Sequence, residues 1–252
     1  MDAHTSSHPL DPLLHRLAQW RELTGPERAA VLALPHSVAT TEPRRHIIRQ
    51  GSTSAHACLL ISGFAFREKI VVDGSRSISS IHMRGDVVNL QNSLVGVANH
   101  SVQALTRCKV ALVPRDAVAQ LAFAFPNIGM GLWYDTLVQA SMFREWIASI
   151  ARRNARARIA HLLCEFGVRL EAAGLGSKVN YQLPMSQEHL GDCVGLTPVH
   201  VNRTLKDLEA SGDITRSKRD VAIADWAKIS RTAGFEDDYL QLASRTMTRA
   251  FV

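Results

Sequence analysis

The segment SQEHLGDCVGLTPVHVNRTLKDLEASG at residues 186–212 predicts two helices joined by a short glycine turn. Ser186 can cap the first helix with its hydroxyl, and Gly195 suits the left-handed residue that ends it. Thr197 can cap the second helix, in which Pro198 takes the first position, where a missing N–H is tolerated. This pattern is typical of a helix-turn-helix, whose second helix lies in the major groove of DNA.

The second predicted helix has one apolar and one polar face. Val201, Leu205 and Leu208 recur at spacings of four and three, so they form one apolar stripe. On the other face, asparagine can pair with adenine, arginine with guanine, and valine can pack on a thymine methyl. A surface hairpin of helices with solvated charges is the alternative. The residues expected to read bases are Val199, His200, Asn202 and Arg203.

The next stretch, DITRSKRDVAI at 213–223, predicts a β-hairpin with a basic tip. A hairpin directly after a recognition helix is a wing, and its cations suit DNA phosphates, although a solvated charged turn is the alternative. The residues expected to contact phosphates, with the two helix caps included, are Ser186, Thr197, Lys206, Arg216, Lys218 and Arg219.

Composition narrows the class of protein. The 252 residues are enough for two domains, and a net charge of +6 favours a polyanionic partner. No apolar run approaches the roughly 18–20 residues of a membrane span. The polar start, MDAHTSSHPLDP, lacks the apolar core of a signal peptide. We therefore expect a cytoplasmic protein without membrane contact.

Neither a metal site nor an enzyme is expected. The 11 histidines form no H-E-x-x-H motif, and the cysteines contain no C-x-x-C pair. Phosphate-binding glycine loops and G-x-S-x-G nucleophile motifs are also missing from the sequence, so we predict no cofactor and no catalytic residues. The thiols are expected to be reduced and mostly buried: Cys58, Cys108, Cys164 and Cys193.

The rest of the chain is β-rich first and helical afterwards. Two short amphipathic helices are predicted at residues 12–23 and 26–34. Between Ser37 and Pro114, short β-rich runs alternate with glycine turns, which favours a compact all-β barrel or roll. A short helix is predicted at 115–125, and Asn154 can cap a longer one over 155–173.

One long helix is predicted from Pro126 to about Arg153. Its apolar stripe has coiled-coil spacing, and the β-rich region is too small to cover about 40 Å of helix. We therefore expect the stripe to pack against a second copy of the chain. The residues assigned to this contact are Leu132, Ala140, Phe143, Ile147 and Ile150.

The order of β-roll, long helix and winged helix resembles the bacterial cyclic-AMP receptor protein/FNR family of transcription regulators. The resemblance spans about Pro35 to Ile223 and is closest in LPMSQEHLGDCVGLTPVHVNRTLKDLEASGDI at 183–214. The segment at 143–166, FREWIASIARRNARARIAHLLCEF, is similar to the rhizobial-type members of that family. The matching stretches of the roll are RQG at 49–51, LLISGF at 59–64 and RGDVV at 84–88.

The resemblance implies an α+β fold and a dimeric DNA-binding regulator. It places two N-terminal helices and a β-roll sensor of the cyclic-nucleotide-binding type in residues 1–125, and a dimerisation helix in 126–153. A winged-helix DNA-binding domain with a C-terminal extension then fills 154–252. The implied partners are a second copy of the chain and double-stranded DNA with a twofold-symmetric site. RNA polymerase is a further candidate partner.

The effector pocket departs from the family pattern. Members that bind cyclic AMP carry a Gly-Glu pair for the ribose and an Arg-Ser pair for the phosphate. Here Asn89-Leu90 and His100-Ser101 stand at those positions. Leucine cannot accept a ribose hydrogen bond, and neutral histidine replaces a bidentate arginine poorly. The chain also has no cysteine before Cys58, so the cluster of the oxygen-sensing members is absent.

Two regulatory modes remain open from the sequence. In the first, the roll senses an unknown small molecule other than cyclic AMP. In the alternative, the regulator is independent of any effector and the roll is only a structural dimerisation scaffold. The operator should also differ from the common family site, because Pro198-Val199 replaces the Arg-Glu of many members while Arg203 is kept.

Overall fold

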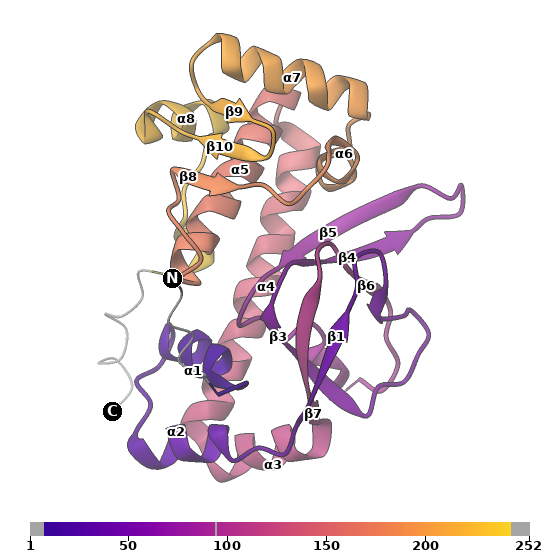
Figure 1. Cartoon of the computed structure of the whole chain (residues 1–252), viewed down its shortest axis with the longest axis vertical. Helices are drawn as coiled ribbons and strands as arrows, with labels where there is room; N and C mark the ends of the chain where they lie inside the picture. Colours follow the sequence, from indigo (N-terminus) through magenta and orange to yellow (C-terminus); the bar gives the residue numbers. More distant parts are fainter. Residues whose placement is uncertain (1–7, 94, 243–252) are drawn as a thin grey trace. The chain divides into compact units, whose positions relative to one another are not determined.

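Short strands separated by glycine turns build the first half of the chain, and helices build most of the second (Figure 1). The computed structural model describes residues 8–93 and 95–242. These residues divide into two compact units. One comprises residues 8–67 and 81–137, and the other comprises 68–80 and 138–242. The helix predicted at 126–153 contributes to both units.

The first unit contains most of the predicted β-roll, and residues 68–80 of the roll belong to the other unit. The strands of the roll form two antiparallel layers, with the orders β1-β7-β3 and β2-β6-β4-β5. Two helices precede the roll and two follow it. Their bounds are α1 (Asp11–Ala18), α2 (Gly25–Leu32), β1 (Ser37–Thr41), β2 (His46–Ile48), β3 (His56–Ser62), β4 (Ala65–Ile70), β5 (Arg76–His82), η1 (Leu90–Ser93), β6 (Ser101–Ala104), β7 (Cys108–Pro114), α3 (Arg115–Ala124) and α4 (Pro126–Arg152).

A glycine fixes the sharp turn between β3 and β4. Gly63 has φ +88, and a Cβ atom there would lie 2.4 Å from the Arg107 carbonyl oxygen. Only glycine combines a positive φ with so close a backbone approach. The turn returns the chain into the roll. After it, the Phe64 N–H donates a hydrogen bond to the Thr106 hydroxyl at 2.9 Å.

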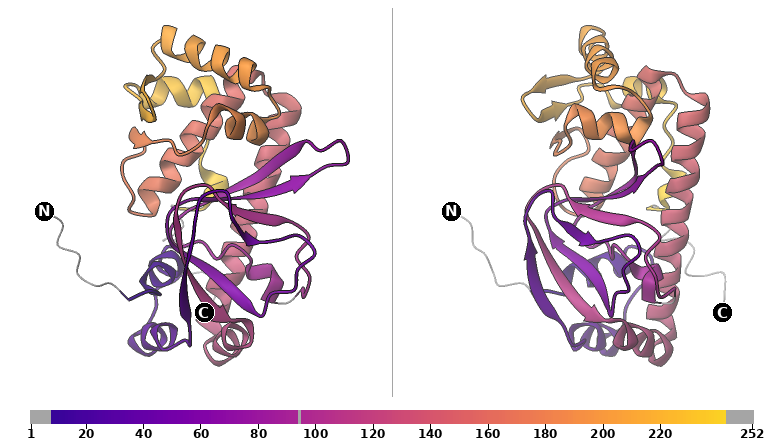
Figure 2. Two further views of the ribbon diagram at one scale, coloured as in Figure 1. Left: turned by 45° about the vertical axis from the view of Figure 1, so that its right-hand side comes forward. Right: turned by 90° about the vertical axis from the view of Figure 1, so that its right-hand side faces the viewer.

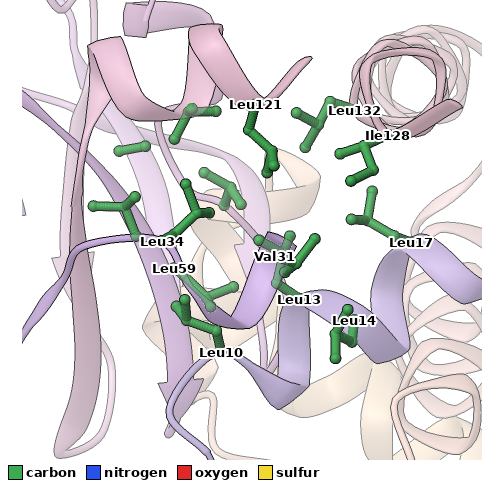
Figure 3. Close-up of a cluster of buried hydrophobic side chains, with 14 of the residues drawn as sticks. Leu10, Leu13, Leu14, Leu17, Val31, Leu34, Leu59, Leu121, Ile128 and Leu132 are labelled. Carbon is green, nitrogen blue, oxygen red and sulfur yellow. The ribbon is translucent and has the colours of Figure 1, made fainter. Parts of the chain in front are cut away.

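Two apolar cores hold the first unit together. One fills the interior of the roll and includes Ile48, Leu60 and Val110. The other lies where the N-terminal helices pack on β3, α3 and the start of α4 (Figure 3). It contains the leucines of α1 together with Leu59, Leu121, Ile128 and Leu132. The N-terminal helices are therefore part of the folded unit.

The second unit contains the winged helix. Its elements are α5 (Ala155–Ala172), β8 (Asn180–Gln182), α6 (Gln187–Val194), α7 (Pro198–Ala210), β9 (Thr215–Ser217), β10 (Asp220–Ala222), α8 (Trp226–Ala233) and η2 (Asp238–Leu240). The hairpin β9–β10 pairs with β8 in a sheet of order β8-β10-β9, which is the predicted wing with a third strand. Together the two units confirm the predicted α+β architecture. Figure 2 gives two further views, with α7 at the outer edge of its unit.

Helix α4 corrects one of the predicted partner contacts. Leu132 is only 9% exposed and packs in the first unit's core, so it is not available to a second chain. Ala140 and Phe143 are half-buried, whereas Ile147 and Ile150 are 68% and 40% exposed. Trp133 and Leu137, at 59% and 50%, extend the exposed apolar face instead. The periodic apolar pattern predicted the helix correctly. At its N-terminal end, however, the exposed apolar residue is Trp133 and not the neighbouring Leu132.

None of the helices in the described part of the chain is both long and apolar enough to cross a membrane.

Candidate nucleic-acid interface

The predicted caps of the helix-turn-helix are confirmed. The Ser186 hydroxyl accepts a hydrogen bond from His189 N at the start of α6, and the Thr197 hydroxyl accepts one from His200 N at the start of α7. Gly195 ends α6 in the left-handed conformation, at φ 67 and ψ 43. These three residues fix where each helix begins or ends, and therefore the length of the turn.

Close backbone packing fixes α6 relative to α7. A Cβ atom at Gly191 would lie 2.3 Å from the Leu196 carbonyl oxygen, and Leu196 N donates to Gly191 O at 3.1 Å. The apolar stripe of α7 is fully buried beneath it, with Val201, Leu205 and Leu208 at most 1% exposed. Because this stripe packs into the core of the unit, the opposite face of α7 is exposed to solvent.

That outward face brings together most of the predicted reading residues. Val199 is 81% exposed, Arg203 and Lys206 are exposed, and Asn202 is half-buried. Their spacing of three and four residues places them on one side of the helix. His200 is also half-buried, but it falls at the flank of this face. Arg203 forms no ion pair with any residue that the structure describes, so its guanidinium is available to a base.

The wing presents two exposed cations and one paired cation. Lys218 and Arg219 are exposed at the tip, where Lys218 adopts a φ of 55. Arg216 lies within the sheet, and its guanidinium donates to Glu209 of α7 at 2.8 Å. Arg216 therefore links the wing to α7 through an ion pair. The predicted phosphate contact by this side chain would require the ion pair to open.

The acidic side chains of α6 are also paired. The Arg76 guanidinium, from the 68–80 segment of the same unit, donates to Asp192 at 2.7 Å and to Glu188 at 2.9 Å. Carboxylates near a DNA-binding face repel phosphate, and a cation held between them reduces that repulsion. No local pattern in the sequence predicts this arrangement, because Arg76 lies more than 100 residues before the two carboxylates that it pairs with.

A buried carboxylate, that of Asp213, lies beneath the helix pair and was not predicted from the sequence. Asp213 is fully buried and accepts hydrogen bonds from Arg156 at 2.5 Å and from the Ser211 hydroxyl at 2.6 Å. Burial alone would raise the pKa of the Asp213 carboxyl, but the bonds from Ser211 and Arg156 outweigh it and lower the pKa. The ionised carboxylate joins α5 to the end of α7.

The side chains at the predicted effector positions are engaged in structural contacts within the roll. Asn89 is fully buried and bonded to backbone on both sides: its Oδ1 accepts from Cys58 N at 2.7 Å, and its Nδ2 donates to His56 O at 2.9 Å. Leu90 packs against the core formed with the N-terminal helices. The Ser101 hydroxyl accepts from Gln50 N at 3.0 Å. Each of these groups already has a structural role.

His100 carries no charge at neutral pH. Burial is the main cause that lowers its pKa to about 4, and the electrostatic effects of Arg67 and His82 lower it further. Its Nδ1 lies 2.6 Å from Asn99 Oδ1, and its Nε2 lies 3.3 Å from Gln91 Nε2. A neutral imidazole in this setting cannot replace the arginine that holds a cyclic phosphate.

The four cysteines are free and buried, as predicted. Burial raises the pKa of the Cys58 and Cys164 thiols to about 12, so both remain protonated. Within residues 8–93 and 95–242, no group of three or more His, Cys, Asp or Glu side chains is placed to hold a metal ion.

Comparisons with known proteins agree with this geometry. A family model described as "Crp-like helix-turn-helix domain" matches residues 157–232, and one described as "Cyclic nucleotide-binding domain" matches residues 40–124. The transcriptional activator protein FnrL of Cereibacter sphaeroides is 26% identical over 196 residues, which cover 76% of this chain and 78% of FnrL.

Two rhizobial proteins are also similar. The nitrogen fixation regulation protein FixK of Azorhizobium caulinodans is 23% identical over 239 residues, covering 91% of this chain and 96% of FixK. The solved structure of FixK2 from Bradyrhizobium japonicum has a TM-score of 0.73 at 22% identity, with 81% of this chain and all of that chain covered.

A β-roll followed by an outward-facing recognition helix and a wing defines a DNA-binding regulator of transcription rather than an enzyme. The chain belongs to the CRP/FNR family of transcription regulators.

Proposed function

We propose that this regulator binds DNA as a homodimer and reads each half of a twofold-symmetric site with α7, using Arg203 as its main base reader. The observation that carries the proposal is the exposed face of α7, where Arg203 lies beside Val199, Asn202 and Lys206. A guanidinium can donate two parallel hydrogen bonds to guanine, which is the commonest specific contact in the major groove.

The exposed apolar face of α4 supports a dimer. Trp133, Leu137 and Ile147 are each at least half exposed on a helix of 27 residues, about 40 Å long. Exposed apolar surface of this extent usually marks an interaction site. A second copy of α4 is the matching partner, because two such stripes can pack as a coiled coil.

The interior of the roll argues against cyclic AMP as the effector. The nucleotide would bury a phosphate charge and a ribose hydroxyl, and each needs a polar partner. The side chains of Asn89 and Ser101 are bonded to backbone, and His100 is neutral. The effector is therefore a different small molecule; a roll that serves only as a scaffold is the second candidate.

Mutation can distinguish base reading by Arg203 from contacts to DNA phosphates. Arg203→Ala should cost about 1–3 kcal/mol on the best site and relax the preference at one base pair per half-site. Lys206→Ala or Lys218→Ala should instead weaken binding to every sequence similarly and reduce the salt slope by about one per half-site. Fluorescence anisotropy with matched and substituted operators at several salt concentrations measures both effects. An Arg203→Ala protein with unchanged sequence preference would refute the assignment.

Cyclic AMP should not bind with physiological affinity. Isothermal titration near neutral pH is expected to give no saturable heat, because an unpaired buried phosphate costs several kcal/mol. Operator binding should be the same with and without the nucleotide. A dissociation constant in the low micromolar range, together with tighter operator binding in the presence of cyclic AMP, would contradict the proposal.

A further inference from the structure

One hydrogen bond links the two helices of the reading unit at the DNA-facing surface. Gln187, the first residue of α6, donates from Nε2 to Asn202 Oδ1 on α7 at 3.3 Å. Gln187 is exposed and Asn202 is half-buried. The bond therefore lies at the edge of the reading face, beside Val199 and Arg203.

The two ends of this bond are held by the fold. The Ser186 cap and its reciprocal contact with His189 fix the start of α6, and thus the backbone of Gln187. The close approach of Gly191 to the Leu196 carbonyl fixes α6 against the turn that leads into α7. The amide of Asn202 is free to rotate about its last torsion unless another group holds it. Gln187 supplies that constraint.

The orientation of the Asn202 amide matters for base reading. An asparagine that pairs with adenine must offer its carbonyl oxygen to N6–H and its NH2 group to N7 at the same time. The oxygen has two lone pairs, so it can accept from Gln187 and from a base together. A reversed amide would present a donor where adenine also has a donor, and the pairing would fail.

We propose that Gln187 is a positioning residue that sets the base preference of α7 by holding the Asn202 amide in one orientation. The inference rests on the proposed function, because it requires α7 to read DNA. Gln187 acts through Asn202 and needs no base contact of its own. Its removal should change which base is preferred at one position while leaving the fold and the other positions unchanged.

The test uses the full chain and its selected operator, together with operators substituted at each base pair of the half-site. Asn202→Ala identifies the base pair that Asn202 reads, where discrimination should fall by roughly 5- to 150-fold. Gln187→Met has similar length but no donor, and it should reduce discrimination at the same base pair by at least about threefold. The double variant should show no further loss beyond that of Asn202→Ala.

Two further variants sharpen the experiment. Gln187→Glu can only accept a hydrogen bond, so it should favour the reversed amide and shift the preference at that base pair away from the wild-type base. Gln182→Met is the matched control, since Gln182 is an exposed glutamine on β8 of the same unit. It should leave the base preferences as they are. Equal unfolding temperatures for wild type and variants would show that the fold is intact.

Unchanged preference in Gln187→Met would overturn the inference. So would an effect at a different base pair, or one that adds fully to that of Asn202→Ala, because Gln187 would then read DNA directly. A wild-type protein without any preferred sequence would contradict the proposed function itself, which distinguishes that failure from a failure of this inference.

Discussion

Replacing Ile147 by glutamate should convert the protein to a monomer and lower its affinity for a two-half-site operator by at least about 100-fold. Ile147 is 68% exposed on α4, so the substitution disturbs little within one chain. In a dimer, two glutamates would face each other in an apolar interface, where an unpaired buried charge costs several kcal/mol. A monomer then loses the avidity of two linked reading helices.

Sedimentation equilibrium and operator titration measure the two effects of Ile147→Glu. Val38→Glu is the matched control, because Val38 is a β-branched residue that is 50% exposed on β1 rather than on α4. The control should remain dimeric and bind as wild type does. A wild-type protein that sediments as a monomer at micromolar concentration would contradict the dimer, as would an Ile147→Glu variant that stays dimeric.

Gly191→Ala should destabilise the winged helix by about 3 kcal/mol and weaken DNA binding in proportion. Alanine normally stabilises a helix interior by up to about 1 kcal/mol relative to glycine. Here its Cβ would lie 2.3 Å from the Leu196 carbonyl oxygen, a backbone atom that cannot move without shifting the turn. The clash therefore outweighs the gain in helix propensity, and α7 is displaced from its position.

Urea unfolding followed by circular dichroism measures the loss at Gly191. Gly25→Ala provides the comparison, because Gly25 starts α2 and no atom lies within 4 Å of its added Cβ. That variant should keep its stability within about 1 kcal/mol. If Gly191→Ala retained wild-type stability and operator affinity, the close packing of the turn would not be what positions α7.

Local signals in the sequence were sufficient to predict the helix-turn-helix. Ser186, Gly195 and Thr197 act on the backbone within four residues of themselves, so their roles follow from their neighbours alone. The spacing of Val201, Leu205 and Leu208 likewise determined which face of α7 is buried. The reading face follows by exclusion, and no contact between distant parts of the chain is needed to identify it.

Other features depend on partners that lie far away in sequence or on other elements. Periodicity cannot distinguish burial in the chain's own core from burial against a second chain, which is why Leu132 was assigned to the wrong surface. Arg216 was predicted from its position in the wing, but its charge is paired with Glu209 on α7. The buried carboxylate of Asp213 is paired with Arg156 of α5, which lies far from it in sequence.

Helix α8 was missed for a different reason. It has only eight residues, of which Ile229 and Ala233 are buried, so few apolar positions mark its inward face. Its ends nevertheless carry recognisable capping residues. The Asp225 side chain caps the start of the helix, and Gly234 ends it in the left-handed conformation. Capping signals at 225 and 234 would have indicated a helix after the wing.

Sequencing of DNA fragments selected by the purified full-length protein is the most direct test of the central claim, which is sequence-specific reading by a dimer. We expect one enriched inverted repeat, with half-site centres about one helical turn, or about 10 base pairs, apart. Arg203→Ala should lose the preference for one guanine in each half of that repeat. Fragments without a common motif, or a motif without twofold symmetry, would contradict the account.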